Sequence, residues 1–266
     1  MRRKHLEAVE FLSHCAPDNC EVGIILGTGL GGLVRDIDIS NSVEYSQIPN
    51  FPVSTVESHS GKLIFGKLSG KNIVAMQGRF HYYEGYSMSQ VTFPVHVMKE
   101  LGVKYLIASN ACGALNHQFR KTDLMILTSH INLLFDTPLK KLPVNFVDGS
   151  RFYSKRLIDL AEKTAIENCI SIQKGSYVPV QGPNLETSAE YRMIRRFGGD
   201  TVGMSTIPEV TVANNLGIEC LGLSIITDEG FPDTLKVAAL KDILHAASIA
   251  EPKLTLLIRN LVKKLD

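Results

Sequence analysis

Strand-like and helix-like segments alternate along almost the whole chain, and this alternation constrains the fold more than any other feature. Short apolar runs such as residues 21–26 and 219–226 are typical of strands that are buried on both faces. Between such runs lie segments with helical spacing of apolar residues, such as 154–168 and 187–197. The pattern therefore predicts an α/β fold with a central sheet covered by helices on both sides.

The remaining predicted elements follow from the same two periodicities. Residues 62–68 and 72–76 predict a hairpin through Ser69-Gly70, and residues 87–101 predict one helix with a kink at Pro94. The other predicted strands are 105–109, 124–131, 175–180 and 201–204, and the other predicted helices are 1–12, 208–216 and 237–265.

Composition narrows the class of protein. The 266 residues carry 44% hydrophobic side chains and a net charge of +1, so a sizeable core is expected and a nucleic-acid or anionic membrane partner is not. No linker or repeat divides the chain, which predicts one domain over residues 1–266. The five cysteines are scattered without a CxxC pair, and no apolar run is long enough to span a bilayer. We therefore expect a cytoplasmic protein without disulfide bonds.

Residues 76–85, with the sequence MQGRFHYYEG, combine several chemically useful side chains directly after a predicted strand. Arg79 offers a fork of donors suited to phosphate or carboxylate, and His81 can shuttle a proton near neutral pH. Tyr83 adds a hydroxyl. The segment predicts an anion site beside a hydroxyl-bearing ligand; the alternative is a solvated loop with an exposed Arg–Glu pair.

A glycine-rich loop, Gly27-Thr-Gly-Leu-Gly-Gly32, follows the first strand and matches G-x-G-x-x-G. A dinucleotide-binding fold would need a helix next, but residues 34–41 alternate and are β-branched, and no acidic residue ends a second strand about twenty residues on. The simpler interpretation is an anion nest of backbone N–H groups, to which the Thr28 hydroxyl adds a donor.

Other loops extend this anion hypothesis. His59 lies in a turn, Asn110–Gly113 offers backbone donors after a strand, and Ser205 supplies a hydroxyl at another strand end. The histidines lack HExxH or other short ligand spacing, so no metal site is predicted. No GxSxG motif appears and nothing near Cys112 activates a thiol, so covalent catalysis is not expected either.

Six motifs taken together resemble the trimeric purine nucleoside phosphorylases, in the right order and from about residue 20 to residue 235. They are GTGLGGL (27–33), HSGKLIFG (59–66), MQGRFHYYEGY (76–86), SNACGALN (109–116), GPNLETSAE (182–190) and VGMSTIPEV (202–210). The resemblance implies the nucleoside phosphorylase fold, with a mixed and partly barrel-like sheet. It also implies a phosphate-dependent cleavage of purine nucleosides, inosine and guanosine first, to free base and ribose 1-phosphate in purine salvage.

The resemblance also implies roles for individual residues. Phosphate is expected to be the co-substrate, with no cofactor and no metal, and His81, Glu186 and Asp228 are the expected catalytic residues. The expected phosphate-binding residues are Thr28, His59, Arg79, His81, Ala111 and Ser205. The expected ribose-binding residues are Tyr83, Met204, Phe146 and Leu240. The expected purine-binding residues are Leu185, Glu186, Val202, Thr227 and Asp228.

Three positions depart from the family pattern. Asp228 stands where the family usually has asparagine, and an ionised aspartate only accepts hydrogen bonds, so the preference between 6-oxo and 6-amino purines stays open. Leu185 replaces a phenylalanine near the base. Leu240 falls about where many members have a histidine near the ribose 5′-hydroxyl, which makes a methylthioadenosine phosphorylase the alternative.

Phe146 aligns with an aromatic residue that reaches a neighbouring subunit's sugar site, so the resemblance implies a homotrimer, although Phe152 lies close by and competes for that role. Two other readings use the same residues: a non-catalytic nucleoside or phosphate sensor, and a nucleosidase that uses water. Phosphate dependence separates them from a phosphorylase.

Overall fold

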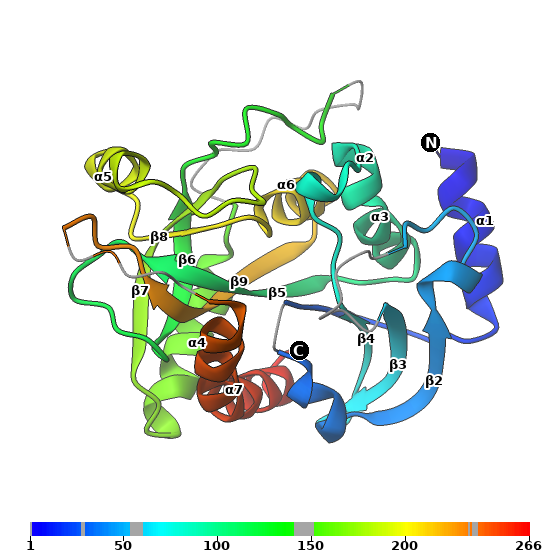
Figure 1. Ribbon diagram of the computed structural model, residues 1–266. Helices are drawn as coiled ribbons and strands as arrows, with labels where there is room; N and C mark the ends of the chain where they lie inside the picture. The colour runs from blue at the N-terminus through cyan, green and yellow to red at the C-terminus, as the bar shows by residue number, and fades with distance from the viewer. Residues whose placement is uncertain (1, 28–29, 54–60, 141–151, 234, 236–238) are drawn as a thin grey trace.

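A mixed β-sheet runs through the protein (Figure 1). The computed structural model describes residues 2–27, 30–53, 61–140, 152–233, 235 and 239–266, and the strands among them are hydrogen-bonded in the order β2-β3-β4-β1-β5-β8-β7-β6-β9. The strands are β1 (Val22–Leu26), β2 (Asp38–Glu44), β3 (Lys62–Leu68), β4 (Lys71–Gln77), β5 (Tyr105–Ala114), β6 (Leu124–His130), β7 (Ile172–Pro179), β8 (Thr201–Gly203) and β9 (Glu219–Glu229).

Strand β5 has a special place in this sheet because it pairs with β9 as well as with β1 and β8. The extra pairing closes β5, β8, β7, β6 and β9 into a ring, while β1 to β4 extend from β5 as an open sheet. The mixed, partly barrel-like sheet that the family resemblance implied is therefore confirmed.

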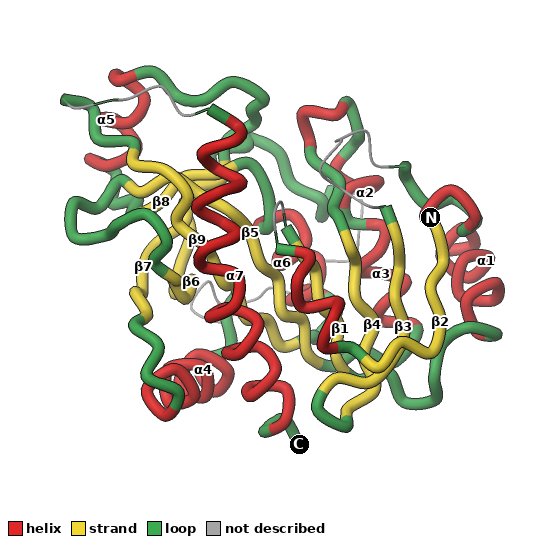
Figure 2. Tube along the Cα trace, turned by 60° about the horizontal axis from the view of Figure 1, so that its bottom comes forward, coloured by secondary structure: helices red, strands yellow, loops and turns green. Residues whose placement is uncertain are grey.

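Helices cover both faces of the sheet, as predicted (Figure 2). Leu12 of α1, Val97 of α3 and Val210 of α6 pack into one apolar cluster, whereas Leu157 of α4 and Leu257 of α7 belong to a second cluster. The helices are α1 (Arg2–Ser13), α2 (Met88–Val91), α3 (Phe93–Glu100), α4 (Lys155–Glu167), α5 (Ser188–Arg196), α6 (Ile207–Asn215) and α7 (Leu240–Lys263), and the short 3₁₀ helices are η1 (Gly31–Asp36), η2 (Tyr45–Gln47) and η3 (Tyr82–Glu84).

Most predicted elements are confirmed within a few residues, and local chemistry explains their ends. The β3–β4 hairpin turns through Ser69 and Gly70, both with positive φ, which is the tight turn that matches strand twist. Helix α4 begins after Ser154, whose hydroxyl accepts the Leu157 N–H.

Two predictions were wrong. Residues 87–101 form two helices rather than one kinked helix, because Pro94 lies in the first turn of α3 and the chain breaks at Thr92, whose hydroxyl donates to Met88 O at 2.8 Å. Residues 110–114 were predicted as loop but continue β5. The prediction ended the strand too early because glycine is rare in strands. A Cβ at Gly113 would lie 2.7 Å from Asp228 Oδ2, so the glycine leaves room for the Asp228 carboxyl.

Among the described helices, none combines the length and the apolarity that crossing a membrane requires.

Candidate active site

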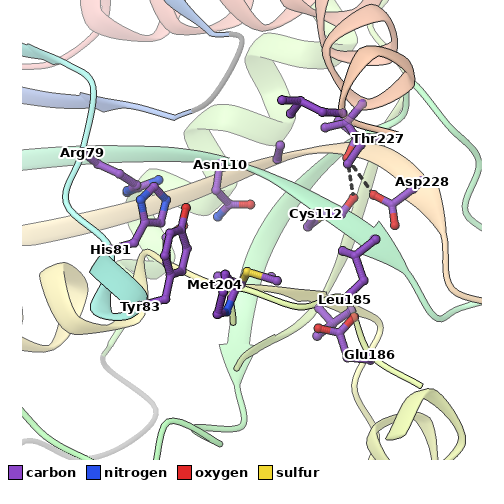
Figure 3. A pocket seen from close by; sticks show the side chains of 18 residues that line it. Arg79, His81, Tyr83, Asn110, Cys112, Leu185, Glu186, Met204, Thr227 and Asp228 are labelled. Carbon is purple, nitrogen blue, oxygen red and sulfur yellow. Dashed lines mark hydrogen bonds between the residues drawn. The ribbon is translucent and has the colours of Figure 1, made fainter. Parts of the chain in front are cut away.

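The family resemblance gave roles to fifteen residues, and twelve of them line one pocket (Figure 3). These twelve are spread over more than 160 positions of the sequence. They are Arg79, His81, Tyr83, Ala111, Leu185, Glu186, Val202, Met204, Ser205, Thr227, Asp228 and Leu240. The other three, Thr28, His59 and Phe146, lie outside the described residues. The pocket is also lined by Asn110, Cys112, Gly113, Pro183, Gly203 and Ile243.

Arg79 enters the pocket from the end of β4 and is 1% exposed. Gly78, with φ +111°, turns the chain after the strand, and Tyr45 Oη donates to its carbonyl at 2.8 Å. The guanidinium donates through Nε to Glu209 Oε1 at 3.1 Å and through Nη1 to the Ser109 carbonyl at 2.6 Å. Arg79 is therefore part of a buried ion pair, not the exposed Arg–Glu pair considered above.

His81 has a carboxylate partner of its own in Glu84. The His81 backbone N–H donates to Glu84 Oε1 at 2.7 Å, and ring Nδ1 lies 3.1 Å from the same oxygen. Because an ionised carboxylate only accepts hydrogen bonds, this contact favours the tautomer of His81 with its proton on Nδ1. The ring stacks on Tyr83 with centroids 4.8 Å apart. Helix η3 and its N-cap residue, His81, thus supply two pocket side chains in a fixed orientation.

Ser205 follows β8 in a tight turn. Its backbone N–H donates to Tyr177 Oη at 3.3 Å, and its carbonyl accepts the Ile207 N–H at 2.9 Å. The residue between, Thr206, has φ +78° and ψ −47°, which is a strained γ-turn conformation for a β-branched side chain. Such an outlier persists only where its surroundings hold it.

Thr227 and Asp228 reach the pocket together because β9 is irregular at this point. Consecutive strand residues normally face opposite sides of a sheet, but the β5–β9 register shifts between Cys112 and Gly113, which leaves Thr227 unpaired. Thr227 Oγ1 lies 2.9 Å from Asp228 Oδ1 and 3.3 Å from the Cys112 carbonyl (Figure 3). Burial raises the pKa of the Asp228 carboxyl, which favours its neutral form.

Glu186 lies directly before Thr187, the residue that caps α5. The Thr187 hydroxyl accepts the Glu190 N–H at 3.3 Å, which fixes the start of the helix. Burial raises the pKa of the Glu186 carboxyl, while a hydrogen bond from Tyr191 opposes the change. Two carboxyl groups, Glu186 and Asp228, therefore line one end of a pocket whose other end holds Arg79 (Figure 3).

Cys112 lines the pocket as well, but burial raises the pKa of its thiol to about 12. A thiol of that pKa stays protonated and is a poor nucleophile. No group of three or more His, Cys, Asp or Glu side chains that could hold a metal occurs in the described part of the chain.

The sequence did not predict the residues whose hydrogen bonds orient the pocket side chains. Glu209 was overlooked although it lies in the VGMSTIPEV motif, because a carboxylate after proline looks like an ordinary first-turn residue. Glu84 was seen only as a surface partner for arginine, and Asn110 only as a source of backbone donors. The spacing of His81 and Glu84 at i, i+3 was the available signal for that pair.

The fold and this pocket define a member of the phosphorylase superfamily: the sequence profile of that family matches residues 21–263, and the chain belongs to it. Its relatives include purine nucleoside phosphorylase 1 of Geobacillus stearothermophilus, which is 51% identical over 234 residues covering 86% of this chain and 85% of the relative.

Two solved structures agree with this assignment. Schistosoma mansoni purine nucleoside phosphorylase in complex with adenosine superposes with a TM-score of 0.91 at 36% identity, covering 99% of this chain and 98% of the other. A schistosome purine nucleoside phosphorylase in complex with hypoxanthine gives a TM-score of 0.90 at 36% identity, with the same coverage. The family resemblance read from the six motifs is thus confirmed.

Because burial raises the Asp228 pKa, its ionised form costs folding free energy. The cost is absent below the ordinary carboxyl value of 3.8 and grows as pH rises through the raised pKa of the folded state. We expect Asp228→Asn to increase the free energy of unfolding at neutral pH by on the order of 1 kcal/mol, the scale of most single substitutions. The gain should shrink as pH falls, measured by urea unfolding across pH.

The matched control is the same exchange, aspartate to asparagine, at the exposed Asp18. Asp18→Asn should show no comparable gain at any pH. A stability gain for Asp228→Asn that did not depend on pH would contradict a buried, ionisable carboxyl as its cause.

Proposed function

We propose that this protein cleaves purine nucleosides with inorganic phosphate, inosine and guanosine first, giving the free base and ribose 1-phosphate in purine salvage. One observation carries the proposal: twelve residues chosen from the sequence for these roles line a single pocket, in a chain that is 51% identical to a purine nucleoside phosphorylase.

The phosphate end of the pocket is proposed to be built from Arg79, His81, the Ala111 backbone N–H and Ser205, with Thr28 and His59 joining them. Arg79 carries a fixed charge held in place by Glu209, and charge-assisted hydrogen bonds to an oxyanion are the strong ones. A phosphate held there can attack the sugar carbon from below, and its negative charge stabilises the positive charge that develops on the sugar. His81, with its proton on Nδ1 fixed by Glu84, completes the clamp.

The base end is proposed to be read by Glu186 and Asp228, between Leu185, Val202 and Thr227. Glu186 would accept the N1–H of a 6-oxopurine. The raised pKa of Asp228 favours a neutral carboxyl that can donate to N7 of the leaving base, where negative charge develops. The ribose would lie between the two ends against Tyr83 and Met204, with Leu240 and a neighbouring subunit's Phe146 at its edge.

A second candidate is phosphorolysis of 5′-methylthio nucleosides. It is favoured by Leu240 and Ile243, the apolar residues that the start of α7 adds to the pocket, because neither can bond a ribose 5′-hydroxyl.

We also propose a homotrimer in which Phe146 completes a neighbouring subunit's site, working in the cytoplasm without cofactor or metal. The mass in solution by light scattering tests this: a monomer would overturn it.

The proposed function predicts that inosine and guanosine release free base only when phosphate is supplied. The reason is that the proposed phosphate-binding residues position phosphate as the attacking group, and hydrolysis does not use phosphate. Glu186→Ala should lower kcat/KM for inosine by about 100-fold or more, since the variant leaves the base N–H unpaired. The measurement is base release with and without phosphate from inosine, guanosine, adenosine and methylthioadenosine. Glu10→Ala, an exchange at an exposed glutamate of α1, serves as the control.

Equal turnover with and without phosphate would refute the phosphorylase in favour of a nucleosidase. No turnover of any substrate would favour a non-catalytic binding protein. Faster cleavage of methylthioadenosine than of all three 5′-hydroxyl nucleosides would favour the second candidate.

Asp228→Asn should shift the preference towards 6-oxopurines. An asparagine side chain has two N–H donors and can bond N7 and O6 together, whereas a neutral carboxyl has a single O–H to donate and its ionised form repels O6. We expect the ratio of inosine to adenosine kcat/KM to rise by about tenfold, the value of one well-placed hydrogen bond. An unchanged ratio would show that Asp228 does not read the base, and Asp18→Asn again provides the control.

A further inference from the structure

A chain of hydrogen bonds between buried polar side chains starts at Ser205 in the pocket wall. Ser224 Oγ donates to Asn110 Oδ1 at 2.7 Å, Asn110 Nδ2 donates to Thr206 Oγ1 at 2.9 Å, and Thr206 Oγ1 lies 3.3 Å from Ser205 Oγ. All four residues are buried, and they come from β9, from β5 and from the turn after β8. Figure 3 shows Asn110 on the pocket wall between His81 and Cys112.

The chemistry of these groups gives this chain of hydrogen bonds a direction. A carboxamide oxygen only accepts and its nitrogen only donates, while each hydroxyl has one proton to give. Ser224 spends its proton on Asn110, and Thr206 accepts from Asn110. Thr206 keeps its own proton to give, and donating it to Ser205 Oγ, which lies 3.3 Å away, would leave the Ser205 proton to point into the pocket.

The backbone at Thr206 supports a functional reason for this arrangement. Its positive φ is strained for a β-branched residue, yet the residue is completely buried and both its side-chain oxygen and the flanking backbone are hydrogen-bonded. The strained turn is what brings Oγ1 of Thr206 between Asn110 and Ser205. A threonine held in such a conformation is more than a filler of space.

We propose that Thr206 and Asn110 are positioning residues that hold the Ser205 hydroxyl as a hydrogen-bond donor aimed at the phosphate. This inference rests on the proposed function. A free serine hydroxyl rotates and presents its lone pairs as readily as its proton, which repels an oxyanion; a preset donor avoids that reorganisation when phosphate binds.

The test compares Thr206→Ser with Thr206→Ala, two variants that both lose the β-branch and differ in one hydroxyl. For Thr206→Ala we expect the KM for phosphate to rise by about tenfold, one hydrogen bond's worth, with little change in the KM for inosine. Thr206→Ser should keep a KM for phosphate close to that of the unaltered protein. The rise in melting temperature that inorganic phosphate causes without nucleoside should be reduced in the alanine variant alone.

Thr92→Val is the control for loss of a buried hydroxyl elsewhere, since Thr92 bonds the Met88 carbonyl between two helices. It should lower the melting temperature and leave the KM for phosphate unchanged. If Thr206→Ala does not fold, Thr206→Val keeps the branched shape and replaces it.

If the serine and alanine variants have the same KM for phosphate, Thr206 does not position the Ser205 hydroxyl. A parallel rise in the KM for phosphate and for inosine would also overturn this positioning role, because it indicates a distorted pocket. The unaltered protein tells the proposed function and the positioning role of Thr206 apart. If it shows no phosphate-dependent cleavage, the proposed function is refuted. If it cleaves normally while the serine and alanine variants have the same KM for phosphate, only the positioning role is refuted. An unaltered protein that phosphate does not stabilise would overturn both.

Discussion

The buried ion pair between Arg79 and Glu209 is the interaction on which the rest of the site depends. Taking either charge out of water costs several kcal/mol, and the loss is offset only when the partner and further hydrogen bonds are in place. Glu209 Oε1 and the Ser109 carbonyl supply them at 3.1 and 2.6 Å. The pair therefore requires that the chain after β4, the middle of β5 and the first turn of α6 meet at one point.

That requirement also explains the local geometry of α6. The helix begins at Ile207 directly after the strained turn at Thr206, so Glu209 lies in its first turn and faces Arg79. A relaxed turn would aim the helix start elsewhere and leave a charge unpaired. Strain at one residue is thus stabilised by an ion pair three positions further on, and both serve the same wall of the pocket.

The pocket is electrostatically divided along its length. A permanent cation lies at one end, and two carboxyl groups whose pKa values are raised by burial lie at the other. A ligand that is anionic at one end and carries exchangeable protons at the other complements both. The division arises from the sheet, because β4 delivers the cation while β9 and the β7–α5 loop deliver the carboxyl groups.

The sequence allowed the element order and most pocket residues to be predicted, since strand and helix periodicities and glycine-bracketed loops are local signals. Three features could not be predicted from such local signals. The continuation of β5 through Gly113 depends on its neighbours β8 and β9, and the bulge that turns Thr227 inward depends on strand register. The Arg79–Glu209 pair joins residues 130 positions apart, a separation over which no periodicity operates. Long-range pairing decided each of these.

Strand β5 has one further consequence. It is a wall of the closed ring and also the root of the open sheet, so its backbone carries hydrogen bonds to both. Neither part can open by itself without exposing the edge of this strand to water. The ring and the open sheet are therefore coupled through this one strand, and the pocket that β5 helps to line depends on both of them.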